Sequence, residues 1–253
     1  MRAFNFVSIF TSLLVVVAST AAAQTPPPPP PPLWDVQLGA AFVGTGGNSD
    51  TTTLGGDFGL HRRWPDWTIE SGATAVRTTS DDVRTAERYL GAFRGARKLS
   101  PIVSLTAGER AERDKLAGMA FRSILDGGLN WALVRGRAWT LDAVTAVAWN
   151  HEHPVLGVDR NDPIGVLQVL SRSLLGANAD TSERFTFYPD GRDSHAYRAE
   201  AEVTAQAAMT SRLAMKFGFL WRYSNEPIAG FQKTDSTETA SIVVRWRSEK
   251  PAP

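Results

Sequence analysis

The stretch from Leu213 to Tyr223 places a large apolar side chain at every second position. A period of two is typical of a β-strand, whose successive side chains point to opposite faces. One face of this strand is therefore apolar, and the other carries Lys216, Gly218 and Arg222. In a soluble barrel the apolar face points inward, whereas in a membrane barrel it points outward into lipid. The direction of this face decides to which class of protein the chain belongs.

The first residues have the pattern of an export signal. Arg2 precedes an apolar run over residues 4–18, and Ala21–Ala23 fits a cleavage site of small residues. The run is short for a membrane-spanning helix. We therefore expect residues 1–23 to be a signal peptide that is removed near Ala23. The chain has no cysteine, so disulfides and lipid attachment through cysteine are excluded.

Seven consecutive prolines, Pro26–Pro32, follow the expected cleavage site. Such a run forms a stiff polyproline II rod of roughly 20 Å, at about 3.1 Å per residue. We interpret residues 24–32 as a proline-rich periplasmic spacer.

Composition argues against two classes of protein. The 27 Lys and Arg residues nearly balance the 26 Asp and Glu residues, and the basic residues are scattered, so we expect no nucleic-acid partner. After the signal peptide, no apolar run has the length of a transmembrane helix. The mean hydropathy of -0.19 is compatible with membrane strands, because their alternating pattern averages to a low value.

Strand-like patterns recur along the rest of the chain, with turn-forming residues between them. We expect twelve strands, at residues 33–43, 51–62, 67–77, 84–98, 101–113, 119–133, 138–151, 162–175, 183–189, 195–209, 212–224 and 234–246. The strand at 183–189 is short, and Gly176–Ser182 before it reads as a long turn. The sequence thus predicts an all-β fold, an antiparallel transmembrane β-barrel of about 12 strands over residues 33–246, followed by a C-terminal tail at 247–253.

The tryptophans favour the membrane alternative. Two of the eight, Trp149 and Trp221, fall near one end of their strands. The others fall at the opposite strand ends: Trp34, Trp64, Trp67, Trp131, Trp139 and Trp246. Aromatic residues in two girdles are expected where a barrel wall meets lipid head groups.

The lengths of the connections agree with a barrel whose first strand starts at the periplasmic side. The expected periplasmic turns at Leu99–Ser100 and Thr210–Ser211 are tight, whereas the expected outer segments Gly44–Asp50, His153–Asn161 and Asn225–Lys233 are longer. Short periplasmic turns and longer outer loops are the usual asymmetry of these barrels. The turn Gly176–Ser182 departs from it.

If the apolar faces point to lipid, the polar faces line the interior. We predict that the lumen is lined by Asp57, Glu70, Arg110, Arg122, Asp126, Asp142, Arg198, Glu200, Glu202, Lys216, Arg222 and Arg245. Both signs are present in equal number. Opposed charges can close the lumen with ion pairs or leave a narrow polar channel, and the sequence leaves both open without a strong ion preference.

Two short motifs have residue types used in catalysis or metal binding. His151 and His153 would share one face of a strand, but a further ligand is needed to hold an ion. Ser194 and His195 would point to opposite faces, which suits a polar loop better than a nucleophile and its base. We therefore expect no catalytic, cofactor-binding or metal-binding residues.

Two segments resemble a known family. Gly47–Leu54, which begins Gly-Asn-Ser-Asp, and Arg122–Trp131, which contains a glycine-rich step, are similar to the opening and the central strand of the YdiY-like family. That family is a domain of unknown function, described as salt-induced outer membrane proteins. The resemblance covers roughly residues 33–246 and implies a porin-like outer-membrane barrel without established catalytic residues.

The C-terminus differs from the usual barrel pattern. Outer-membrane barrels usually end on an aromatic residue that the assembly machinery reads, whereas here Arg247–Pro253 follow Trp246. We expect Ser241–Trp246 to act as an internal assembly signal.

Together these features predict a non-enzymatic barrel in the outer membrane of a Gram-negative bacterium. It would support envelope integrity or pass small solutes and ions, and the resemblance implies a link to salt stress. Its expected partners are outer-membrane lipid and the assembly machinery. Two alternatives stay open: a surface hydrolase that uses His195 or the pair His151 and His153, and a soluble periplasmic barrel that binds a ligand inside.

Overall fold

The computed structural model describes residues 33–45 and 51–248. The expected signal peptide (1–23), the spacer (24–32), most of the first outer loop (46–50) and most of the tail (249–253) lie outside the described residues.

The described residues form twelve β-strands, the number predicted, and one short 3₁₀ helix that was not predicted. The strands are β1 (Trp34–Thr45), β2 (Thr51–Arg63), β3 (Trp67–Ser80), β4 (Val83–Lys98), β5 (Val103–Asp114), β6 (Met119–Arg135), β7 (Trp139–Pro154), β8 (Arg160–Leu175), β9 (Ala179–Pro189), β10 (Tyr197–Ala208), β11 (Leu213–Ser224) and β12 (Thr234–Arg247). The 3₁₀ helix, η1 (Lys115–Ala117), connects β5 to β6.

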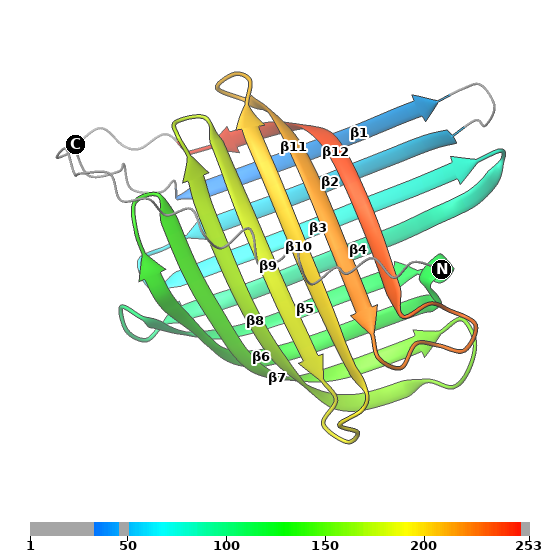
Figure 1. Cartoon of the computed structure of the whole chain (residues 1–253). Coiled ribbons are helices and arrows are strands. Elements are labelled where there is room, and N and C mark those ends of the chain that lie inside the picture. Colours follow the sequence, from blue (N-terminus) through cyan, green and yellow to red (C-terminus); the bar gives the residue numbers. More distant parts are fainter. Residues whose placement is uncertain (1–32, 46–50, 249–253) are drawn as a thin grey trace, which may run out of the picture. The chain divides into compact units, whose positions relative to one another are not determined.

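The strands form one closed antiparallel barrel (Figure 1). Each strand pairs with its neighbours in sequence, and β12 pairs with β1 to close the barrel. The predicted all-β antiparallel barrel is therefore confirmed. In the described part of the chain, no helix is long and apolar enough to cross a membrane.

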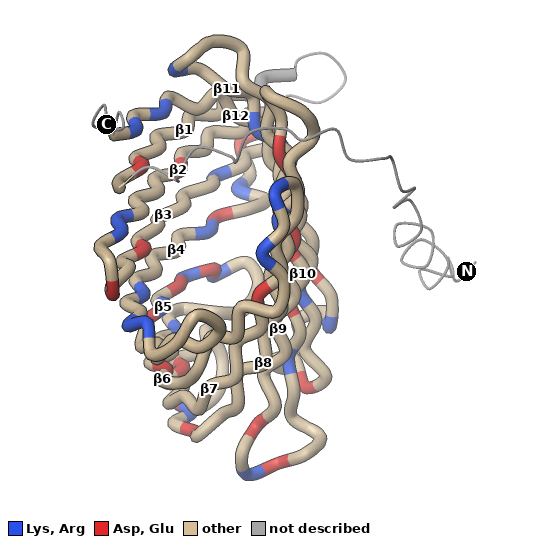
Figure 2. The backbone as a smooth tube through the Cα atoms, turned by 90° about the vertical axis from the view of Figure 1, so that its left-hand side faces the viewer, with Lys and Arg blue, Asp and Glu red and all other residues tan. Residues whose placement is uncertain are grey.

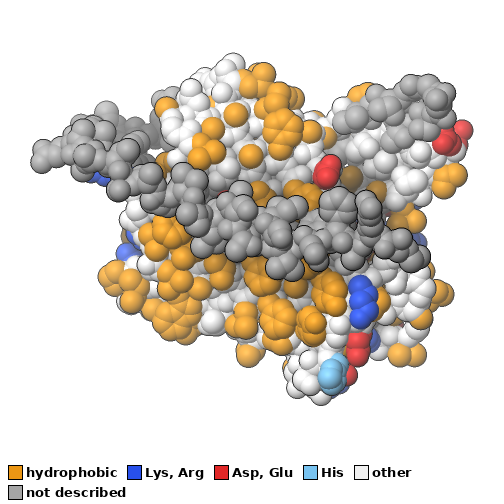
Figure 3. Space-filling model, in the orientation of Figure 1, with side chains coloured by type: hydrophobic (Ala, Val, Ile, Leu, Met, Phe, Trp, Pro, Cys, Tyr) orange, Lys and Arg blue, Asp and Glu red, His pale blue; other side chains and the backbone are white. Residues whose placement is uncertain are grey.

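The apolar face of β11 points out of the barrel. Leu213, Met215 and Phe217 are 37%, 39% and 53% exposed, whereas Ala214 between them is 2% exposed. Lys216 faces the opposite side and contacts Asp57 of β2, which only an inward side chain can reach. Figure 3 shows hydrophobic side chains spread over the outer wall. This exterior suits lipid rather than water, because large exposed apolar patches are rare on soluble proteins.

The two ends of the barrel differ, and one end carries most of the tryptophans. Connections of three or four residues join the strands at one end, which we name the turn end. The start of β1 and the last described residue also meet there, since the Ser248 amide donates to the Trp34 carbonyl at 3.0 Å. Trp67 and Trp139 begin strands at this end, whereas Trp149 lies near the other, which we name the loop end.

One predicted turn is wrong. Gly176–Ser182 was expected to be a long turn at the turn end, but β9 begins at Ala179 and leaves a connection of three residues. Asp180 and Ser182 pair in register with Leu174 and Arg172 of β8. The strand is polar on both faces here, so it carries no apolar alternation that could indicate it.

Part of the barrel interior is apolar. Ile124, Ala148, Ile164, Val166 and Tyr188 form a buried cluster on the inner faces of β6 to β9. This cluster fills one side of the interior, and the charged side chains occupy the space beside it.

Candidate functional site

Arg110 of β5 reaches across the barrel interior to β10. Its guanidinium donates to both carboxylate oxygens of Glu200, at 2.7 and 3.2 Å, and to the Tyr188 hydroxyl of β9 at 3.2 Å. These strands are not neighbours of β5 in the barrel. The contact therefore crosses the lumen and links two walls.

Glu112 is the acceptor on which three arginines converge. Its carboxylate lies 3.4 Å from Arg88, 3.1 Å from Arg110 and 3.0 Å from Arg122, and its side chain is 3% exposed. A buried carboxylate is stable only where charge-assisted hydrogen bonds replace its hydration. Three guanidinium groups provide that replacement here.

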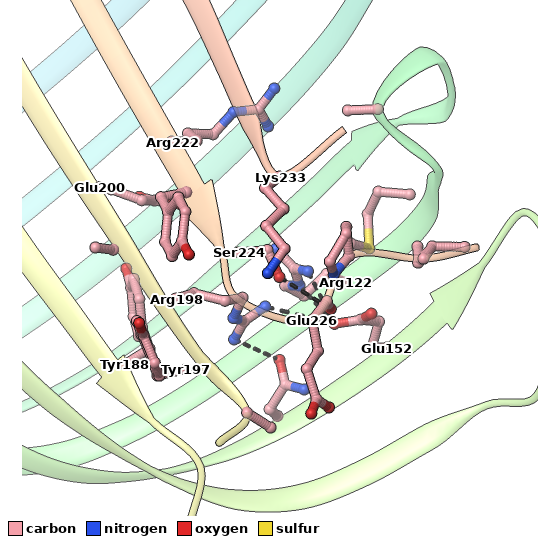
Figure 4. A pocket seen from close by; sticks show the side chains of 18 of the residues that line it. Arg122, Glu152, Tyr188, Tyr197, Arg198, Glu200, Arg222, Ser224, Glu226 and Lys233 are labelled. Atoms are coloured by element: carbon pink, nitrogen blue, oxygen red, sulfur yellow. Dashed lines mark hydrogen bonds and ion pairs between the residues drawn. The ribbon is translucent and has the colours of Figure 1, made fainter. Parts of the chain in front are cut away.

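Glu152 of β7 joins the same system from the other side. It accepts from Arg122 at 2.9 Å and from Arg198 of β10 at 3.4 Å. Arg198 also donates to Asn150 at 3.3 Å and lies over the Tyr188 ring (Figure 4). Arg198 therefore forms a second cross-barrel link, between β7 and β10.

A third link connects β11 to β5 through Arg222 and Asp114, at 2.6 Å. We name the whole set the central network: Arg88, Arg110, Glu112, Asp114, Arg122, Glu152, Arg198, Glu200 and Arg222. Figure 2 shows acidic and basic positions interspersed along the strands rather than segregated by wall.

The loop between β11 and β12, residues 225–233, covers the network at the loop end. It lines a cavity of about 100 Å³ together with network residues (Figure 4). Phe231 and Ile228 lie against Gly118 on the opposite wall, where an added Cβ would be 2.9 and 3.1 Å from them. Asn225 anchors the loop by donating to the His195 carbonyl at 2.8 Å. The cavity is smaller than the roughly 300–1,000 Å³ of usual ligand pockets.

The structure places all twelve predicted lumen residues on the face opposite to the apolar exterior, and five of them belong to the central network. Five of the other seven pair with a residue on the adjacent strand or the next strand but one: Glu70 with His61, Asp126 with Arg94, Asp142 with Arg135, Glu202 with Arg184, and Arg245 with Asp35. The remaining two, Lys216 and Asp57, pair with each other across the β1–β12 seam. Their contact with a passing solute stays a prediction.

Sequence reasoning missed the acidic centres of the network. Glu112 and Asp114 follow Arg110 by two and four residues, so their spacing alone puts them on its face. Glu152 was overlooked between two histidines, although it has the inward parity that they lack. Arg88 lies in a strand where both faces mix charge and bulk, and no pattern there indicated its direction.

The histidine motifs lie away from the network. His151 and His153 face outward at the loop end and contact Asn161 at 2.6 Å and Asp159 at 2.5 Å. His195 lies in the β9–β10 connection, where its amide donates to Asp193 at 2.8 Å. Within residues 33–45 and 51–248, no group of three or more His, Cys, Asp or Glu could hold a metal ion.

Sequence comparison assigns the chain to a family. The model of the family "Protein of unknown function, DUF481" matches residues 36–246. The chain belongs to the DUF481 family. The match spans nearly the range of the YdiY-like resemblance and is compatible with it. No curated protein matches the sequence.

Solved structures similar to this DUF481 member are outer-membrane barrels. The COG4313 outer membrane channel from Pseudomonas putida F1 is 12% identical, with a TM-score of 0.51 over 90% of this chain and 100% of that chain. The NanC porin is 13% identical, with a TM-score of 0.48 over 85% of this chain and 100% of that chain. At this identity, the similarity to the channel shows a common fold.

Proposed function

We propose that this protein is a non-enzymatic barrel of the outer membrane that passes small solutes and ions through a narrow polar interior. One observation carries the proposal: an apolar exterior encloses an interior crossed by ion pairs. Lipid-facing apolar side chains and a polar lumen are what a water-filled barrel needs in a bilayer. The similarity of fold to an outer membrane channel supports the proposed channel function.

The central network sets the width of the proposed pathway. Arg110–Glu200 and Arg198–Glu152 each join strands on different walls, so a solute has to move past or between these pairs. The cavity beneath the β11–β12 loop is about 100 Å³, which suits water and small ions. The pathway is therefore expected to have a small conductance.

The two other functions are less well supported. A soluble barrel would not expose Phe42 and Val147, which are 73% and 76% exposed. For a hydrolase, His151 and His153 face away from the cavity. A role in envelope integrity or salt stress stays a prediction from the family resemblance, as does insertion by the assembly machinery through Ser241–Trp246.

Membrane fractionation tests the location. The protein should stay with membranes through salt and carbonate washes, and it should migrate differently on a gel before and after heating, because folded barrels resist detergent until heated. Release of the protein by carbonate would contradict the proposed membrane location.

Conductance in planar bilayers tests the pathway. The wild-type protein should give small, ion-carrying steps, and Glu200→Gln should enlarge them because it releases one cross-barrel link. Glu202→Gln is the matched control, since its pair with Arg184 is half exposed and joins adjacent strands. If both variants and the wild type carry no current at several voltages, the network closes the lumen and the channel proposal is wrong.

A further inference from the structure

The seam between β1 and β12 is paired over only part of its length. Six residues of β1, Asp35–Ala40, pair with Ile242–Arg247. Beyond them, β1 and β12 diverge (Figure 1), and among the strands that the structure describes none pairs with Thr234–Ser241 on this side. Within residues 33–45 and 51–248, the barrel wall therefore forks towards the loop end, and eight residues of β12 have no strand partner on this edge.

The free edge is polar on both faces. Thr234–Ser241 reads Thr-Asp-Ser-Thr-Glu-Thr-Ala-Ser, whereas the paired part of β12 presents Ile242, Val244 and Trp246 on its outer face. An unpaired backbone group in hydrocarbon costs several kcal/mol. A hydroxyl-rich strand keeps water or another polar group at such an edge, so the fork suits a polar occupant.

Apolar side chains flank the fork on the outside. Phe42 on β1 and Leu54 on β2 are 73% and 61% exposed, and Phe217 on β11 is 53% exposed. Inside the fork, the Lys216 ammonium lies 3.4 Å from the Asp57 carboxylate and joins β11 to β2 across the seam. The opening thus offers apolar contact on its outer flanks and polar contact at its edge.

We propose that the β1–β12 fork is a lateral opening in the barrel wall that binds single-chain amphiphiles with a cationic head group. The chain would lie against the apolar flanks and the head group would meet the β12 edge. Glu238 is exposed and is the charged residue on the outer face of Thr234–Ser241, whereas Asp235 faces the interior in register with Arg222. With no Lys or Arg on that outer face, Glu238 favours a cation over an anion. The proposal rests on the membrane location proposed above.

A second copy of the chain fits this edge poorly. Two β12 edges in antiparallel contact would place the exposed Glu238 carboxylates of both copies along one seam. Charged residues on an edge strand are a common device against such pairing. An amphiphile meets the acidic edge without this repulsion.

Disulfide trapping tests the fork itself. Because the chain has no native cysteine, every disulfide that forms comes from the introduced pair. Continuing the register of the six pairs would place Phe42 opposite Ala240. We expect Phe42→Cys with Ala240→Cys to resist oxidation, while the paired control Leu38→Cys with Val244→Cys cross-links. Equal cross-linking of both pairs would show a closed seam and overturn the proposal, whatever the membrane location.

Quenching tests the occupant. The protein, in nanodiscs of neutral phospholipid, carries bimane at Ala240→Cys or, as control, at the outward Ala107→Cys on β5. Brominated dodecyltrimethylammonium should quench bimane at Ala240→Cys with a saturable dependence on its concentration. It should quench bimane at Ala107→Cys only in proportion to the amount dissolved in the bilayer. Glu238→Gln should weaken the apparent affinity about fivefold, as for one partly exposed charge pair. Equal, unsaturable quenching at both labels would overturn the site, and equal binding of brominated dodecyl sulfate would overturn the cationic preference.

Discussion

Glu112 shows at the scale of one residue how the interior depends on complete pairing. Its carboxylate serves three arginines at once, so its loss leaves their charges without a shared acceptor. Removing one member of a buried charge system costs more than the intact pair contributes, because the remaining charge is desolvated and unpaired. The network is thus stable as a whole and sensitive at each acidic position.

We expect Glu112→Gln to lower the free energy of unfolding by about 3 kcal/mol. The matched change Glu202→Gln should cost less than about 1 kcal/mol, because the Glu202–Arg184 pair is half exposed. Urea unfolding in lipid vesicles, followed by tryptophan fluorescence, measures both values. Equal losses would indicate that the interior is uniformly wet and that the convergence on Glu112 adds no stability.

Gly118 is the residue on which the β11–β12 loop rests. Its φ of +84° is in the left-handed region, and a Cβ there would meet Phe231. Lys233 is already exposed, so Gly118→Ala should act by loosening the loop backbone and making the bond after Lys233 easier for trypsin to cleave. Gly176→Ala is the matched control, since Gly176 has a φ of +78° with open space around it. Both variants place alanine at a positive φ, which costs about 1 kcal/mol of backbone strain, but only Gly118→Ala should speed cleavage after Lys233.

At the scale of the element, the β11 strand can be tested on each face separately. Phe217→Glu puts a charge on the lipid side and should cost on the order of 2 kcal/mol. Gln206→Glu puts the same charge on the inner face of β10, opposite Lys216, and should be tolerated. The yield of heat-modifiable folded barrel after assembly into vesicles measures the difference. Equal yields would contradict the outward direction of the apolar face.

Most elements could be predicted because alternation and turns report local geometry. β11 and the paired part of β12 have one apolar face each, and their bounds were expected within one residue. The start of β9 could not be predicted, because Asp180–Ser182 is polar on both faces. Its strand conformation follows from pairing with β8 rather than from its own pattern.

For the candidate site, the face of the strand on which each side chain lies could be predicted, but the ion pairs that these side chains form could not. Parity along each strand places Arg110 and Glu200 on the inner face, yet their ion pair joins residues 90 positions apart. That contact depends on barrel closure and on how far the two walls approach each other, and no local pattern encodes either. The free edge of β12 was missed for the same reason, since only the register with β1 shows where pairing stops.

At the scale of the whole molecule, the sign balance of the interior sets the ion selectivity that we expect of the proposed channel. The predicted lumen residues comprise six basic and six acidic side chains, and the central network interleaves both signs. A pathway lined in this way favours neither cation nor anion strongly. We therefore expect a reversal potential near zero in a potassium chloride gradient.

Removing acidic side chains should shift that balance in one direction. Glu152→Gln with Glu200→Gln leaves Arg110, Arg122 and Arg198 in excess along the cross-barrel links. The reversal potential should then move towards that of chloride, because the remaining guanidinium groups raise the local concentration of anions. Glu202→Gln, which leaves the network intact, should move it little. An unchanged reversal potential in the double variant would place the ion pathway away from the central network, with the β1–β12 side of the barrel as the remaining route.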